Sequence, residues 1–102
     1  AVCVLTHDAK FDVPALVATL ATDVGYVGAM GSRRTHADRV ARLVEAGVDE
    51  AGLARIRAPI GLDVGARTPE ETAVSICAEI IAQRTGRADA RPLRDTDGPI
   101  HR

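Results

Sequence analysis

The stretch Gly31-Ser32-Arg33-Arg34 contains the residue types of an anion-binding turn. It follows a short, apolar, glycine-spaced run at 26–30 that suits a buried strand, and a segment with helical periodicity begins at Thr35. A helix N-terminus offers free backbone N–H groups and the positive end of the helix dipole, which together favour an anion. Two arginines at that end are unfavourable for the helix itself. A bound anion would offset that cost, and so would plain exposure to solvent.

A second polar group, Thr6-His7-Asp8, ends the β-branched apolar run at 1–6. In open α/β sheets ligands bind just outside the carboxyl ends of the strands, so these residues are candidate site residues by position. The alternative is that Asp8 caps a turn and His7 is merely exposed. If the runs at 1–6 and 26–30 form adjacent parallel strands, this loop and the arginine turn lie at the same edge of the sheet.

Asp63 is a third candidate, because it stands between Leu62 and Val64 in an extended or loop-like segment at 58–68. A carboxylate in apolar company usually has a partner. Arg67 or an arginine of the turn could supply that partner, and an exposed turn residue is the alternative. Arg33 and Arg34 could in the same way pair with nearby acids, namely Asp8, Asp38 or Asp63.

Helical patterns separate these polar groups. A first helix is predicted at 12–23, with Asp12 as N-cap, Pro14 in the first turn, and an apolar face of Val13, Leu16, Val17 and Leu20. A second is predicted at 35–46, with Ala37, Val40, Ala41 and Val44 facing inward and Arg39, Arg42 and Glu45 largely in solvent. A short helix follows at 49–56, with Leu53 and Ile56 pointing inward.

The clearest helix start is Thr68-Pro69-Glu70-Glu71. Thr68 is a suitable N-cap, proline suits the first helical position, and Glu71 completes a capping box. We predict a helix at 69–84, with an inward stripe of Ala73, Ile76, Cys77, Ile80 and Ile81. The segment 86–102 is polar and contains Pro, Gly and Asp, which predicts a disordered tail after a domain at 1–85.

The order of these elements predicts an α/β fold. Strands joined by a helix of this length are most simply parallel, with a right-handed crossover. Two strands, or three if the segment around Ile60 pairs, form a thin sheet, so the chain resembles half of a doubly wound, Rossmann-like domain with three main helices. The exposed edge of the first strand predicts self-association or a missing N-terminal half. Position 1 is not Met and already belongs to a strand, so we expect a piece of a longer protein.

Composition excludes several classes of function. The chain of 102 residues is 46% hydrophobic and 26% charged with a formal net charge of −1, so charge favours neither nucleic acid nor a membrane surface. With one Phe, one Tyr and no Trp, it has no base-stacking platform. Cys3 and Cys77 have no ligand spacing around them and are predicted to be buried, inert thiols. A cytoplasmic location is expected, and no motif for a metal site or a glycine-rich phosphate loop is present.

Three motifs carry a resemblance to a known family: LTHDAKFDVPAL at 5–16, YVGAMGSRRTHADR at 26–39 and PIGLDVGARTPEETAVSICAEI at 59–80. They resemble, in unbroken order over residues 1 to about 84, the C-terminal Rossmann half of the XdhC/CoxI family. Proteins of that family are maturation factors for molybdenum hydroxylases such as xanthine dehydrogenase.

The resemblance implies a chaperone that acts by binding and transfer rather than by turnover. It would hold the molybdopterin form of the molybdenum cofactor while a sulfido ligand is installed, and then pass it to the apo-enzyme, with a cysteine desulfurase as a further partner. The residues that match family motifs at strand ends are Thr6, His7, Asp8, Gly31, Ser32, Arg33, Arg34, Gly61, Asp63, Gly65 and Arg67. The family's glycine-rich opening turn and N-terminal domain are absent from this sequence. The alternative is an NAD(P)-binding oxidoreductase module with a half-Rossmann fold. In such a module His7 would have to act as the acid or base of hydride transfer, because the sequence has no other obvious candidate.

Overall fold

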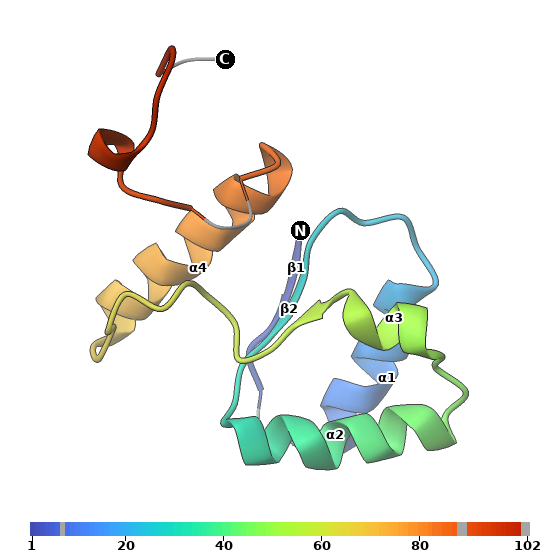
Figure 1. The fold of residues 1–102 in the computed structure, drawn as a ribbon. Helices are drawn as coiled ribbons and strands as arrows, with labels where there is room; N and C mark the ends of the chain where they lie inside the picture. Colours follow the sequence, from blue (N-terminus) through green and yellow to red (C-terminus); the bar gives the residue numbers. More distant parts are fainter. Residues whose placement is uncertain (7, 88–89, 101–102) are drawn as a thin grey trace.

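A three-stranded parallel sheet forms the centre of the molecule (Figure 1). The computed structural model describes residues 1–6, 8–87 and 90–100. Its strands lie in the order β1 (Val2–Val4), β2 (Val27–Ala29) and β3 (Ile56–Arg57). The predicted α/β fold is confirmed, and so is the parallel pairing of the first two strands, in which Val2 is aligned with Val27. The third strand forms at 56–57, and Ile60 adds one hydrogen bond from its N–H to the Ala29 carbonyl at 3.2 Å.

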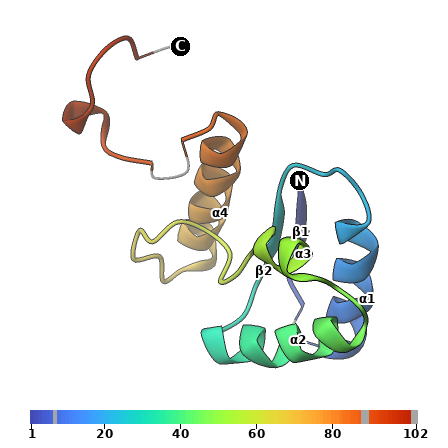
Figure 2. The same ribbon diagram turned by 45° about the vertical axis from the view of Figure 1, so that its right-hand side comes forward.

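Helices cover both faces of this sheet. The helices α1 (Ala9–Leu20) and α2 (Arg33–Glu45) pack on one face, and α4 (Pro69–Arg84) lies on the other, as Figure 2 shows from a second direction. A short helix, α3 (Glu50–Ala54), leads into β3. Leu16 of α1 and Leu43 of α2 are fully buried against Val4, Val27, Ala29 and Ile56, which together form the apolar core.

The N-terminus of α1 differs from the prediction. Asp8 is the N-cap: its Oδ1 accepts a hydrogen bond from the Lys10 N–H at 3.0 Å, and its carbonyl accepts from the Asp12 N–H at 2.9 Å. The helix therefore begins at Ala9, so Asp12 is not the cap and Pro14 lies inside the helix rather than in its first turn. The predicted apolar face of this helix is confirmed, since Leu16 is buried and its apolar neighbours Val13, Val17 and Leu20 pack against the core.

The predicted inward face of α2 is wrong. The helix begins at Arg33 because Ser32 caps it, and it turns Arg39 and Leu43 toward the sheet. Val44, predicted to face the core, is 55% exposed. Arg39, predicted to lie in solvent, is buried because its guanidinium binds Asp12 of α1 and the carbonyl of Met30, which follows β2. The sequence of α2 does not reveal these partners.

The inward face of α4 is also different from the predicted stripe. Its bounds and its Thr68–Glu71 capping box are as predicted. The buried residues, however, are Ser75, Glu79 and Ala82, whereas Ala73, Cys77 and Ile81 are exposed. The Ser75 hydroxyl donates to the Leu62 carbonyl at 2.6 Å. Directed bonds from polar side chains thus fix the rotation of this helix.

Glu79 is the centre of the contact between α4 and the sheet. Its Oε1 accepts hydrogen bonds from the Tyr26 hydroxyl at 2.6 Å and from the Gly61 N–H at 3.1 Å. Gly28 makes this packing possible, because a Cβ there would lie 2.5 Å from Cδ1 of Ile60 and 2.9 Å from the Tyr26 hydroxyl. A side chain at residue 28 would therefore force Ile60 or Tyr26 to shift, and glycine avoids this where the loop before α4 approaches β2.

Both cysteines are free, with Cys3 half-buried and Cys77 exposed, so the prediction of a buried thiol is wrong for Cys77. No helix in the described part of the chain is long and apolar enough to cross a bilayer. Residues after α4 include one turn of 3-10 helix, Leu93–Asp95, and the predicted disorder of this tail stays a prediction. β1 lies at an edge of the sheet, where pairing with another strand is possible, and self-association through it also stays a prediction.

Tyr26 gives a direct test of the α4 contact, because it is the one tyrosine of the sequence. Burial, and next the hydrogen bond and negative charge of Glu79, raise the pKa of this phenol well above its ordinary value. A folded pKa above the unfolded value means that the stabilisation is present below about pH 10 and is lost as pH rises beyond it. In an alkaline titration followed by ultraviolet absorbance, tyrosinate should appear only together with the loss of helical circular dichroism.

The matched variant is Tyr26→Phe. It should lower the free energy of unfolding at neutral pH by about 1–3 kcal/mol, because Glu79 loses one of its donors, and it should unfold with a weaker dependence on alkaline pH. Tyrosinate formation near pH 10 with full helical signal would contradict the buried hydrogen bond.

Candidate functional site

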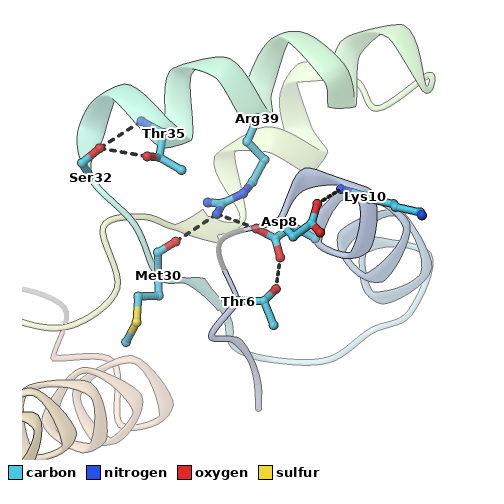
Figure 3. Close-up of polar contacts among 8 residues, drawn as sticks. Thr6, Asp8, Lys10, Met30, Ser32, Thr35 and Arg39 are labelled. Atoms are coloured by element: carbon cyan, nitrogen blue, oxygen red, sulfur yellow. Dashed lines mark hydrogen bonds and ion pairs between the residues drawn. The ribbon is translucent and has the colours of Figure 1, made fainter.

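Two helix N-termini lie at the carboxyl edge of the sheet. Thr6 follows β1 and precedes α1, and the turn Gly31–Arg34 joins β2 to α2, so the predicted shared edge is confirmed (Figure 3). At α2, Ser32 Oγ accepts from the Thr35 N–H at 3.1 Å, and the Ser32 carbonyl accepts from the His36 N–H at 3.0 Å. The edge therefore carries two capped helix starts. At α1 the Asp8 carboxylate and Asp12 already place negative charge at the helix N-terminus, whereas α2 has no acidic residue in its first turn, so its start is the one that suits an anion.

A buried ion pair joins these two helices. Arg39 Nη2 lies 2.9 Å from Asp12 Oδ2, and both side chains are 2% exposed. The same nitrogen donates to the Met30 carbonyl at 2.9 Å, and the Thr6 hydroxyl donates to Asp12 Oδ1. One cluster thus connects the end of β1, the end of β2, α1 and α2, and it holds the edge in place.

Sequence reasoning missed both members of this pair. The sequence pattern predicts Asp12 as an N-cap and Arg39 as a solvated charge. The signal that could have found them is their spacing, because each stands one helical turn before a fully buried leucine, Leu16 or Leu43, and so shares its inward face. The cluster also uses the Thr6 hydroxyl, which had been a candidate ligand residue.

Two further nitrogen atoms on the inner side of α2 are buried without a hydrogen-bond partner in the described part of the chain: His36 Nδ1 and Arg39 Nη1. Burial, and then the charge of Arg39, lower the pKa of His36. His36 is consequently favoured in its neutral form inside the fold. It was not among the predicted site residues.

A groove of about 550 Å³ runs along β3 and reaches the start of α2. It is lined by two residues that the sequence selected for the site, Arg33 and Asp63, together with Gly61 of the matching motifs. Arg57 and Glu79 also line it and were not predicted. The structure thus brings the arginine turn and the Asp63 loop to one groove although they are far apart in sequence.

Other predicted residues lie outside this groove. Thr6 and Asp8 stand at the α1 side of the edge. Asp8 caps the helix there, which is the alternative interpretation that the sequence offered for it. Arg34 is exposed. Asp63 is exposed and has no ion pair with another described residue. Of the two interpretations offered by the sequence, a partnered carboxylate or an exposed turn residue, the second therefore holds. Likewise, neither Arg33 nor Arg34 forms an ion pair within the described ranges. His7 lies outside the described residues.

Metal ligation is a separate matter from anion binding. Among the described residues there is no group of three or more His, Cys, Asp and Glu side chains that could hold a metal ion. The chemistry that the edge offers is instead backbone N–H donation, guanidinium charge and carboxylate acceptance.

Known protein families provide the next comparison. The family model described as the XdhC Rossmann domain matches residues 1–80. This chain belongs to the XdhC family. The resemblance carried by the three sequence motifs is therefore confirmed. The matched segment contains β1 to β3, the arginine turn, the Asp63 loop and most of α4.

Curated relatives also match this XdhC domain, among them two with descriptive names. The chain is 38% identical over 84 residues to the molybdenum cofactor insertion chaperone PaoD of Escherichia coli (strain K12), covering 82% of the chain and 26% of that protein. It is 34% identical over 84 residues to a probable xanthine dehydrogenase subunit of Bacillus subtilis (strain 168), covering 82% and 23%. A crystal structure described as a xanthine dehydrogenase from Bacillus halodurans matches with a TM-score of 0.63 and 28% identity, covering 89% of the chain and 25% of that structure. The chain spans about a quarter of the length of these proteins.

The Asp12–Arg39 pair is open to a direct test. Arg39→Met leaves a buried, uncompensated carboxylate, so the free energy of unfolding should fall by about 3–5 kcal/mol. The double variant Asp12→Leu with Arg39→Met removes both charges and should recover most of that loss. Urea denaturation of the single and double variants measures both quantities.

Arg42→Ala is the matched control, because Arg42 is exposed on the same helix and should change stability by no more than about 0.5 kcal/mol. Equal stability of Arg39→Met and Arg42→Ala would show that the buried pair does not hold the two helices together.

Proposed function

We propose that this XdhC domain supplies the phosphate-binding part of a molybdenum cofactor chaperone. The cofactor is cargo: the protein holds its molybdopterin form while the sulfido ligand is installed, and then passes it to the apo-enzyme of a molybdenum hydroxylase. The observation that carries the proposal is the start of α2, where free amides and Arg33 adjoin a groove that also contains Asp63.

The local geometry suits a phosphate. Ser32 satisfies the N–H groups of Thr35 and His36, whereas those of Arg33 and Arg34 have no partner among the described residues. The turn residue Gly31 has φ of +131°, a conformation that favours glycine. Two N–H groups without partners, the helix dipole and the Arg33 guanidinium would therefore meet a phosphate at this point, with the exposed Arg34 next in the chain.

Asp63 would supply the complementary part of the site. Its exposed carboxylate lies in the same groove as Arg33 and has no ion pair with a described residue, so it is available to accept hydrogen bonds from pterin N–H groups. Thr6 and Asp8 would act differently from the initial expectation, because their side chains organise the edge through Asp12 and the α1 cap. Binding and release of cargo need no acid or base from the protein, which agrees with a chaperone rather than an enzyme.

The relatives' names support the class of cargo and client. One is called a molybdenum cofactor insertion chaperone and another a probable xanthine dehydrogenase subunit, so an apo-enzyme of the xanthine dehydrogenase type is the proposed recipient. Neither name points to a cysteine desulfurase, and that partner stays a prediction of the family resemblance. Because the chain spans about a quarter of these proteins, the remaining parts of the site would come from other segments.

Cofactor retention tests the proposal in a chimera of Escherichia coli PaoD whose matching segment is replaced by that of this chain. Arg33→Ala and Arg34→Ala should each weaken molybdopterin retention about tenfold to a hundredfold, because a charge-assisted hydrogen bond contributes about 1.5–3 kcal/mol. Asp63→Asn should weaken retention less, since an amide oxygen still accepts.

Arg42→Ala is the control on the same helix, far from its N-terminus. NAD⁺ and NADP⁺ serve as competitors, because a dinucleotide presents the same phosphate chemistry. Retention that is unchanged in the Arg33 and Arg34 variants, with circular dichroism intact, would contradict the site. Displacement of molybdopterin by a dinucleotide at equal concentration would instead favour the oxidoreductase alternative.

A further inference from the structure

The outer face of α4 has a regular pattern that the fold leaves unused. Opposite Ser75, Glu79 and Ala82, the helix turns toward solvent a row spaced four, three, four and three residues apart: Glu70, Val74, Cys77, Ile81 and Arg84. Val74 is 67% and Ile81 51% exposed. This spacing is that of a seam along which one helix packs on another. We call this row the α4 seam.

The α4 seam is complementary to itself. Cys77 lies at its centre, with Glu70 seven residues before it and Arg84 seven residues after it. Of the apolar residues, Val74 stands three residues before Cys77 and Ile81 four residues after it, and Ala73, exposed beside the seam, is the residue that a two-fold axis through Cys77 would place opposite Ile81. A two-fold axis through Cys77 would therefore place Glu70 of each copy beside Arg84 of the other, about 10 Å along the helix from the centre.

Neither charge has a competing use in the fold. Glu70 and Arg84 are both exposed, and neither forms an ion pair or a side-chain hydrogen bond with another described residue. The neighbouring Glu71, by contrast, is engaged in the capping box with Thr68. The two end charges of the seam are thus available to a partner, and their opposite signs select an antiparallel second copy.

From this pattern we infer that a second copy of this chain docks on the α4 seam in an antiparallel, two-fold arrangement. The small side chains of Ala73 and Cys77 allow close approach at the centre, and the antiparallel alignment also sets the helix dipoles favourably. Exposed ion pairs at the two ends fix register and orientation more than they add affinity. The inference is independent of cofactor binding, because the seam lies on the side of α4 that faces away from the Glu79 contact.

The area available predicts a weak dimer. A single pair of helices of this length falls below about 1,200 Å² of total buried surface, the range of transient contacts. A groove of about 600 Å³ between α4 and the tail adjoins the seam at Ile81, and the exposed side chains of Leu93 and Ile100 line it. These residues extend the apolar surface beside the seam. Because the dimer is weak, the fraction of dimer should change measurably over a series of protein concentrations.

Charge reversal in the chain of 102 residues tests both the occupant and its orientation. Sedimentation velocity over a concentration series should show dimers of the native sequence. Glu70→Arg and Arg84→Glu should each weaken dimerisation at least fivefold, because like charges then face each other at both ends. The double variant, and an equimolar mixture of the two single variants, should both recover dimers, because each again pairs opposite charges.

Mild oxidation provides a second readout at the centre of the seam. In a Cys3→Ser background, Cys77 should form disulfide-linked dimers, and Glu70→Arg should slow their formation while circular dichroism stays unchanged. A monomer at every concentration would overturn the inference. Dimers that ignore both charge reversals would overturn it too, and would assign association to another surface such as the free edge of β1.

Discussion

The buried ion pair between Asp12 and Arg39 is the interaction on which the candidate site depends. Taking two charges out of water is costly, and here the cost is offset by geometry, because Arg39 also binds the Met30 carbonyl and Asp12 also accepts from Thr6. The pair thereby fixes the ends of two parallel strands relative to the starts of two helices. The Met30 carbonyl that Arg39 binds directly precedes the arginine turn, so the pair helps to position this turn relative to α1.

On the opposite face of the sheet, a buried polar side chain again fixes the position of a helix, here through hydrogen bonds of a carboxylate to neutral donors. Glu79 links the Tyr26 hydroxyl and the Gly61 N–H, and the absent side chain of Gly28 provides the space for this approach. These contacts place the loop after β3, with Asp63, beside Arg33. Val74 and Ile81 of α4 are then left facing solvent, so the helix can pack on the sheet with one face and on a second copy with the other.

Local signals in the sequence were sufficient for β1, β2 and the existence of the four helices. They were not sufficient for β3, because the predicted short helix at 49–56 includes Ile56, the first residue of that strand. The apolar runs predicted parallel strands, and the Thr68–Glu71 capping box predicted the start of α4, because each depends on neighbouring residues. Inward faces were predicted correctly for α1 but not for α2 or α4. The decisive side chains there are polar, and their partners are distant: Arg39 binds Asp12 at a separation of 27 residues, and Glu79 binds Tyr26 at 53. The arginine turn was found because strand, glycine and helix start are adjacent, whereas the groove it shares with Asp63 is a product of tertiary packing.

The central claim is that the start of α2 and the Asp63 loop together bind a phosphate-bearing pterin. It is tested most directly by heteronuclear NMR of the isotopically labelled chain titrated with molybdopterin, with inorganic phosphate as a second titrant. The account predicts that the amide resonances of Arg33 and Arg34 shift with both titrants, and that those of Gly61 and Asp63 shift with molybdopterin only. Shifts confined to the groove between α4 and the tail, with the start of α2 unchanged, would contradict it.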